Sequence, residues 1–303
     1  MGNILIVGTG ALATLFAARL AQAGHPITML GTWKEGLDAL REHGARLVDA
    51  EGNEHQFKIQ ASDHPRECKG IKYALVLVKA WQTERVAGQL KECLAEDGLA
   101  VTLQNGLGNR ETLARSLGLE RVALGITTTG ATLLGPGLVR AGGEGIISME
   151  RHPALGRVEA ALKSANFNVN LVEDAQSLVW GKLIVNAAIN PLTALLRVPN
   201  GKLLESPSAR ELMRTLASEV AQVAAAEKIR LPFSDPIAAA EEVAFKTAAN
   251  HSSMLQDVLR GAPTEIDAIC GAVVQAAQKH NIHTPANWAC WQLVKALAEQ
   301  PNE

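Results

Sequence analysis

The sequence predicts an α/β protein with two domains, a parallel sheet flanked by helices and then an all-helical domain. In the first half of the chain, short apolar runs alternate with helical segments. Two of these runs, residues 74–78 and 99–103, are apolar almost throughout, as strands buried on both faces must be. After about residue 173, Ala-rich segments with helical spacing replace the strand signals. We therefore place the domains at residues 1–173 and 174–303.

Each expected element follows from its own local pattern. Strands are expected where short apolar runs occur, at residues 3–7, 26–31, 74–78, 99–103 and 122–126. Helices with amphipathic spacing are expected between them, at residues 11–23, 82–95 and 109–116. Hairpins are expected where turn residues separate short strands, at residues 44–62 and 137–149. The helices of the second domain are expected near residues 176–190, 208–228, 235–259 and 263–280.

Composition narrows the classes of function. Lys+Arg 29 against Asp+Glu 31 is too balanced for a surface that binds nucleic acid, so a small-molecule partner is expected. The four cysteines are widely spaced, which favours a reducing cytoplasm over a disulfide framework. No signal peptide, and no apolar run near the roughly 18 residues of a membrane span, is expected. His280 and His283 lack a third ligand in spacing, so no metal site is expected.

A glycine loop directly follows the first expected strand and opens the first expected helix. This strand, turn and helix context is typical of a Rossmann-type dinucleotide-binding domain. The first glycine permits the tight turn, and the second lets backbone N–H groups approach a pyrophosphate at the positive end of the helix. The expected cofactor-binding residues of this loop are Gly8, Thr9, Gly10, Ala11, Leu12 and Ala13.

The end of the second strand favours NADP over NAD. A carboxylate there would bind the ribose 2′-hydroxyl of NAD, but the first acidic residue is Glu35. A 2′-phosphate would meet no repulsion and could use Thr32 and Lys34. The alternative is a solvated Lys34 and an enzyme that accepts both cofactors.

Three polar residues share one face of an otherwise apolar helix. Lys182, Asn186 and Asn190 are spaced at i, i+4 and i+8. Burying them is costly unless they meet bound polar groups, as in a site for a small hydroxy or keto acid. The alternative is a solvent-facing stripe in which Lys182 extends its ammonium into water.

Two further segments carry polar residues of interest. Pro263 suits the first position of a helix, which would place Glu265 in a first turn, where a carboxylate is also favoured for purely structural reasons. Asn105 belongs to a loop after strand 99–103, at the sheet edge where such folds bind ligands. A plain turn is the alternative for that loop.

Together these segments resemble the ketopantoate reductase (2-dehydropantoate 2-reductase) family. The resemblance rests on GTGALA, VKAWQ, QNGLG, GITTT, WGKLIVNAAINPLTAL, PNG, SSMLQD and TEID, which extend from residue 8 to about residue 267. It implies NADPH-dependent reduction of ketopantoate to pantoate in pantothenate and coenzyme A biosynthesis.

The resemblance also implies roles for single residues. Lys182 matches the general acid, and Glu265 matches a residue that binds and orients the substrate. Substrate-binding positions are matched by Asn105, Asn186, Asn190, Asn200 and Ser253. Beyond the glycine loop, Thr32 and Lys34, cofactor contacts are implied for Lys79, Asn105, Ala131 and Glu265. Thr32 departs from the family, since relatives place there an arginine that holds the 2′-phosphate.

These roles fit the chemistry of ketone reduction. Hydride transfer builds negative charge on the carbonyl oxygen, so a cation that can donate a proton stabilises the transition state. We expect burial to lower the pKa of Lys182 and a nearby Glu265 to oppose that shift. A reductase of another branched 2-keto or 3-hydroxy acid and a non-catalytic NADP-binding regulator remain alternatives. A monomer or a homodimer, away from membranes, is expected.

Overall fold

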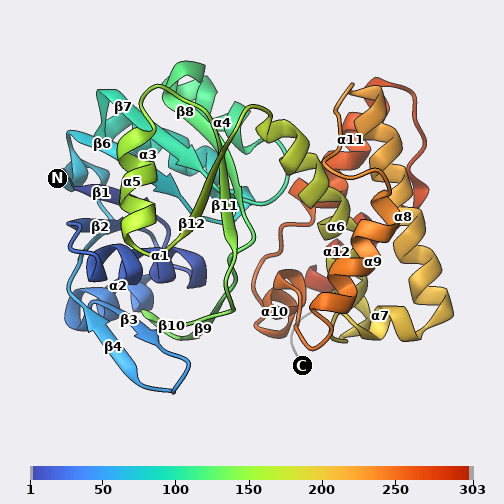
Figure 1. Ribbon diagram of the computed structural model, residues 1–303, viewed down its shortest axis with the longest axis horizontal. Coiled ribbons are helices and arrows are strands. Elements are labelled where there is room, and N and C mark those ends of the chain that lie inside the picture. The colour runs from blue at the N-terminus through green and yellow to red at the C-terminus, as the bar shows by residue number, and fades with distance from the viewer. Residues whose placement is uncertain (1–2, 300–303) are drawn as a thin grey trace. The chain divides into compact units, whose positions relative to one another are not determined.

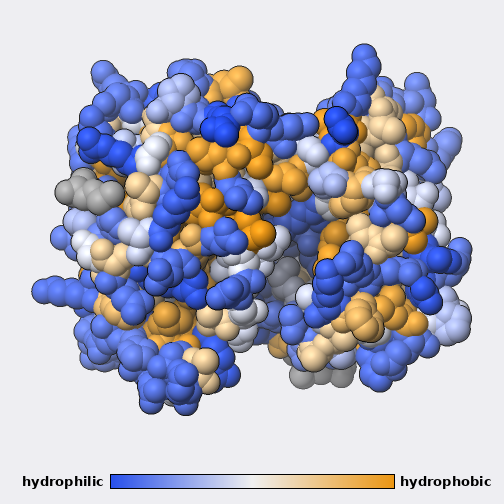
Figure 2. All heavy atoms as spheres, in the orientation of Figure 1, coloured by the Kyte–Doolittle hydropathy of each residue, from blue (hydrophilic) through white to orange (hydrophobic). Residues whose placement is uncertain are grey.

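The computed structural model describes residues 3–299, which form two compact units. The first unit comprises residues 3–104 and 109–175. The second unit comprises residues 105–108 and 176–299, so the loop that follows the expected strand 99–103 belongs to the helical unit. Hydrophilic side chains cover much of the visible surface of both units, with apolar patches among them (Figure 2).

The described part of the first unit contains an eight-stranded sheet in the order β12-β11-β8-β7-β6-β1-β2-β5 (Figure 1). All neighbouring pairs are parallel except β8 and β11. The expected mainly parallel sheet is therefore confirmed. Its strands are β1 (Ile4–Val7), β2 (Ile27–Leu30), β5 (Gln60–Ser62), β6 (Ile71–Val76), β7 (Leu94–Thr102), β8 (Val122–Thr127), β11 (Ile146–Glu150) and β12 (Asn168–Val172).

A four-stranded sheet has the order β4-β3-β10-β9 and contains the first expected hairpin but only part of the second. Its strands are β3 (Ala45–Val48), β4 (Glu54–Phe57), β9 (Ala131–Gly135) and β10 (Leu138–Ala141). The first hairpin is confirmed, since β3 and β4 pair antiparallel. The prediction of a hairpin at residues 137–149 is wrong. The tight turn lies at Pro136 and Gly137, so β10 pairs with β9. Strand β11 belongs to the large sheet instead, where it pairs with β8.

Helices cover both faces of the large sheet because its strands alternate apolar side chains between two cores. Ile4 and Ile6 pack in one cluster with Phe16 of α1, and Leu5 and Val7 pack in the other with residues of α3 and α4. The helices of this unit are α1 (Ala11–Gln22), α2 (Lys34–His43), α3 (Thr83–Cys93), α4 (Asn109–Leu117) and α5 (Gly156–Ser164), with short 3₁₀ helices η1 (Pro65–Cys68), η2 (Ala80–Gln82) and η3 (Leu119–Arg121).

The second unit is helical, as expected, and has its own apolar core. Leu183 and Ile184 of α6 pack there with Met213 and Leu216 of α8 and Val273 of α11. Its elements are α6 (Ala175–Leu196), α7 (Lys202–Glu205), α8 (Pro207–Ala226), α9 (Pro236–Lys246), α10 (Ser253–Leu259), the π-helix η4 (Asp267–Gly271), α11 (Ala272–Lys279) and α12 (Pro285–Glu299).

Two helical expectations in this unit need correction. The segment 235–259 is two helices, because Ser252 caps α10 by accepting the N–H of Leu255 at 3.1 Å. Pro263 does not begin a helix, since the chain becomes helical only at Asp267. Glu265 therefore precedes η4, and its backbone carbonyl accepts the N–H groups of residues 268 and 269. Glu265 therefore does not lie in the first turn of a helix, contrary to the prediction.

Helix α6 also corrects the expectation that no apolar segment approaches membrane-spanning length. By length and composition it could cross a bilayer. Of its most apolar 18-residue window, 67% is buried inside the protein, which is the burial of a core helix.

Candidate functional site

The glycine loop lies where β1 ends and α1 begins. Gly8 has φ 127°, a conformation that side chains rarely adopt, and a Cβ there would meet the backbone carbonyl of Leu77 at 3.1 Å. Gly10 is the N-cap of α1, and within residues 3–299 no side chain caps that helix with a hydrogen bond. The first turn also contains no acidic residue. These features fit the pyrophosphate of a dinucleotide, which needs exposed N–H donors and no competing carboxylate.

The other residues of the loop divide between packing and exposure. Ala13 is fully buried, and Thr9 is buried at 6% exposure. Ala11 and Leu12 are half-buried, and Gly10 is exposed. The backbone of residues 10–12 is therefore the part of the loop that remains open to a ligand.

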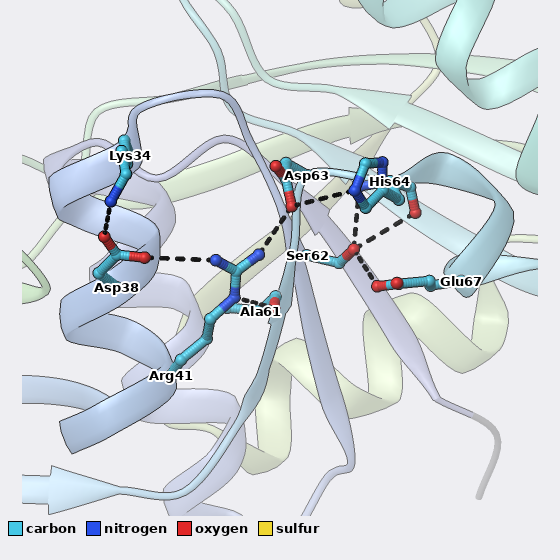
Figure 3. Close-up of polar contacts among 8 residues, drawn as sticks. All are labelled: Lys34, Asp38, Arg41, Ala61, Ser62, Asp63, His64 and Glu67. Atoms are coloured by element: carbon cyan, nitrogen blue, oxygen red, sulfur yellow. Dashed lines mark hydrogen bonds and ion pairs between the residues drawn. The ribbon is translucent and has the colours of Figure 1, made fainter.

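Near the end of β2, the side chains form ionic contacts that the local sequence did not predict (Figure 3). Lys34 begins α2 and forms an ion pair with Asp38 at 2.6 Å, which raises the pKa of Lys34 and lowers the pKa of Asp38. Arg41 donates to Asp38, to Asp63 at 2.7 Å and to the carbonyl of Ala61 at 3.0 Å. These contacts join α2 to β5 and to Asp63, the residue that follows it.

Thr32 lies two residues beyond β2 and accepts a hydrogen bond from Nη1 of Arg85 at 2.5 Å. Arg85 belongs to α3, so the two residues are 53 positions apart in the chain. Of the other expected cofactor contacts, Lys79 caps η2 after β6, and Ala131 begins β9.

In the second unit, α6 carries the lysine and both asparagines of the predicted polar face. Lys182 and Asn186 are half-buried, and Asn190 is buried at 6% exposure. The burial of Asn190 does not fit a solvent-facing stripe.

The electrostatics of Lys182 match the expectation from sequence. Burial lowers its pKa to about 8, and the negative charge of Glu265 opposes that shift. The carboxylate therefore lies close enough to act on the ammonium group. A lysine with this pKa exists in both protonation states near neutral pH, as a proton donor requires.

Asn105 forms a hydrogen bond with the carboxylate of Glu265. Its Nδ2 donates to Oε2 of Glu265 at 3.1 Å, and Glu265 is 5% exposed. The same loop is anchored at Leu107, whose N–H donates to the carbonyl of Ala268 at 3.0 Å. Gly106 has φ 83°, and a Cβ there would lie 2.4 Å from that carbonyl oxygen. Only glycine allows this close approach.

Asn200 and Ser253 are placed differently. Asn200 is 7% exposed and donates through Nδ2 to Thr247 at 2.8 Å, while its Oδ1 is buried without a hydrogen-bond partner among the described residues. Ser253 is exposed at the start of α10. The hydroxyl groups of Ser252 and Thr193 lie 2.7 Å apart and join α10 to α6.

Sequence reasoning missed three contributors to these arrangements. Arg85 and Arg41 reach the end of β2 from other elements, and Thr193 fixes α10 through Ser252. No local pattern indicates the contact of Arg85 with Thr32 or of Arg41 with Asp63, because these partners are 53 and 22 positions apart in the chain. Thr193 could have been suspected, since a hydroxyl on the buried side of a helix needs a partner.

Comparison with known proteins covers both units. Residues 4–154 match the family model described as "Ketopantoate reductase PanE/ApbA", and residues 174–298 match its C-terminal model. The chain belongs to the ketopantoate reductase family. It is 34% identical to the 2-dehydropantoate 2-reductase of Halobacterium salinarum, covering 93% of this chain and 94% of that protein. It is 35% identical to that of Archaeoglobus fulgidus, covering 97% of each.

Similar solved structures include a member of the same family and a dehydrogenase with a different name. The PanE/ApbA family ketopantoate reductase of Ralstonia eutropha JMP134 has a TM-score of 0.91 and 31% identity, covering 98% of this chain and 99% of that one. A D-mandelate dehydrogenase in complex with NADH and anilino(oxo)acetate has a TM-score of 0.92 and 26% identity, covering 98% of each chain. The ketopantoate reductase fold therefore includes a protein that binds NADH.

Proposed function

We propose that this chain reduces ketopantoate to pantoate with NADPH, in pantothenate and coenzyme A biosynthesis, and that Lys182 is the general acid. The observation that carries the proposal is the lowered pKa of Lys182, about 8, beside the buried carboxylate of Glu265. Family membership supports the reaction, since the named relatives are 2-dehydropantoate 2-reductases.

The proton transfer follows from these two residues. A nicotinamide, when bound, supplies the hydride. As the hydride adds to the keto carbon, the carbonyl π electrons move to oxygen, and the Lys182 ammonium stabilises that charge and gives the oxygen a proton. The products are a secondary alcohol and a neutral Lys182 amine. Glu265 holds the ammonium form of Lys182 by its charge and, with Asn105, orients the polar end of the substrate.

The remaining side chains would position the substrate. Asn186 and Asn190 share the face of α6 with Lys182. The unpaired Oδ1 of Asn200 is a buried acceptor suited to a hydroxyl group of the substrate. Ser253 offers a further hydroxyl at the start of α10.

The proposed cofactor set combines backbone and side chains. The N–H groups of residues 10–12 would hold the pyrophosphate, and Thr32 and Lys34, which follow β2, would contact the adenosine ribose. Lys79, Ala131, Asn105 and Glu265 complete the proposed contacts. The lack of a carboxylate before Glu35 supports NADPH.

A second candidate function is reduction of another 2-keto acid. The similarity to a D-mandelate dehydrogenase favours it, because that protein has the same fold and was solved with NADH and anilino(oxo)acetate. A non-catalytic NADP-binding regulator is a third candidate from the sequence, and the lowered pKa of Lys182 favours a reductase over it.

The test is steady-state oxidation of NADPH and NADH with a panel of keto acids. Ketopantoate, 2-ketoisovalerate and phenylglyoxylate are compared by kcat/KM. The proposal expects the highest value for ketopantoate with NADPH. A higher value for phenylglyoxylate would favour the second candidate. Cofactor binding without turnover of any of these acids would contradict a reductase of this class.

A further inference from the structure

The end of β2 lacks the arginine that would be expected to bind the proposed cofactor. In the family pattern an arginine at this position holds the 2′-phosphate, and this chain has Thr32 instead. The structure supplies a guanidinium from elsewhere, because Nη1 of Arg85 on α3 donates to Oγ1 of Thr32 at 2.5 Å. A side chain from a different element thus occupies the neighbourhood of the missing arginine.

The other cations near the end of β2 are already engaged. Lys34 is paired with Asp38 at 2.6 Å. Arg41 contacts Asp38 and Asp63, and it also donates to a backbone carbonyl (Figure 3). A phosphate bound to either cation would have to compete with a carboxylate that already neutralises it.

Arg85 differs from both. Its contact is with a neutral hydroxyl, and within residues 3–299 no carboxylate forms an ion pair with it. Arg85 is exposed to solvent, and the partial burial of its side chain lowers its pKa. An accessible guanidinium without an acidic partner favours an anionic ligand.

We propose that Arg85, held against Thr32, binds the 2′-phosphate of NADPH and replaces the arginine that the family places at the end of β2. This inference rests on the NADPH preference in the proposed function. A guanidinium has five N–H donors in a planar fork, and one contact to Thr32 leaves the others for phosphate oxygens. Because Thr32 accepts from Arg85, its own hydroxyl hydrogen remains to be donated to the same phosphate.

The test compares 2′,5′-ADP with ADP, two fragments that differ in whether a phosphate occupies the ribose 2′ position. Isothermal titration calorimetry measures each dissociation constant for the wild-type protein and for Arg85→Ala. The wild type should bind 2′,5′-ADP at least about tenfold more tightly than ADP, as charge-assisted hydrogen bonds to a phosphate allow. Arg85→Ala should lose about tenfold or more of its affinity for 2′,5′-ADP and less than about twofold for ADP.

Two further variants act as controls. Arg115→Ala removes an exposed guanidinium of α4 that pairs with Glu84, and it should leave both affinities unchanged. Arg85→Lys keeps the charge without the fork and should give an intermediate loss for 2′,5′-ADP. Retained ADP binding shows that each variant is folded.

Three results would overturn the inference: no loss in Arg85→Ala, an equal loss for both nucleotides, or the same loss in Arg115→Ala. None of them concerns the keto acid. Failure of the wild type to turn over ketopantoate would instead contradict the proposed function, and that assay is independent of the calorimetry. The two failures are therefore distinguishable.

Discussion

The proposed sites at the glycine loop of the first unit and at the lysine face of the second unit would bind polar groups by different means. The loop would use backbone N–H groups at the start of α1, which no side chain of the described residues caps with a hydrogen bond. The lysine face uses side chains whose charge depends on burial and on a carboxylate from another segment. A backbone site can be recognised from a short motif. A side-chain site must be assembled by the fold, and single substitutions change its chemistry more strongly.

The largest expected effect is that of Lys182→Ala. Positioned acid catalysis is usually worth about 10²–10⁴ in rate, so kcat for ketopantoate should fall by that factor while NADPH binding is unchanged. Single-turnover and steady-state rates measure the loss, and nucleotide titration checks the first unit. A folded Lys182→Ala protein that retains kcat within about tenfold of wild type would exclude Lys182 as the acid.

Alanine at two glycines separates the backbone site from the side-chain site. Gly10→Ala adds a Cβ that meets nothing within 4 Å, at a φ of −83°, so the fold should tolerate it. The methyl group would obstruct close approach of the pyrophosphate, and NADPH affinity should fall about tenfold, or about 1.4 kcal/mol. Thermal unfolding and nucleotide titration together measure both effects.

Gly106→Ala should behave in the opposite way. Its Cβ would lie 2.4 Å from the carbonyl oxygen of Ala268, at a positive φ. The strain, about 1–3 kcal/mol, should lower Tm by several degrees and raise KM for ketopantoate as Asn105 is displaced. ADP affinity should not change. Unchanged Tm and KM would show that the loop is not anchored as described.

Glu265→Gln tests the electrostatic coupling. Removing the negative charge should lower the pKa of Lys182 further, because Glu265 is the group that opposes the effect of burial. The fall in reductive kcat/KM with rising pH should then begin at a lower pH than in wild type. A pH profile that does not move would show that Glu265 acts only through hydrogen bonds.

The smallest expected effect is that of Asn200→Ala. Loss of one hydrogen bond to substrate should raise KM for ketopantoate about two- to tenfold, with little change in kcat. Thr247→Val is the matched control, since it removes the partner of the Nδ2 group without touching the unpaired Oδ1. Equal KM changes in both variants would mean that Asn200 acts only through packing.

The sequence predicted the features that depend on local pattern. The parallel sheet, the loop at Gly8 and Gly10 and the face of α6 all follow from residue type at short spacing. It predicted the direction of the Lys182 pKa shift because an apolar helix and an acidic residue imply the two opposing causes.

The remaining features depend on contacts between distant segments. The hairpin prediction at 137–149 was wrong because β11 gains its partner, β8, from outside that segment. Arg85 was overlooked because its contact with Thr32 spans 53 positions. The π-helix that follows Glu265 could not be predicted, since η4 and the loop at Gly106 pack against each other.

The most direct test of the account is the pH dependence of kcat/KM for NADPH-dependent reduction of ketopantoate. The lowered pKa of Lys182 means that its ammonium form is lost as pH rises through about 8, well below the ordinary value of 10.5. Reduction should therefore be constant at lower pH and fall tenfold per pH unit above about 8. The fall in kcat/KM at high pH should be absent from the pH profile of the residual activity of Lys182→Ala. A wild-type profile that stays flat to about pH 10, or a fall that persists in Lys182→Ala, would contradict the assignment of Lys182 as proton donor.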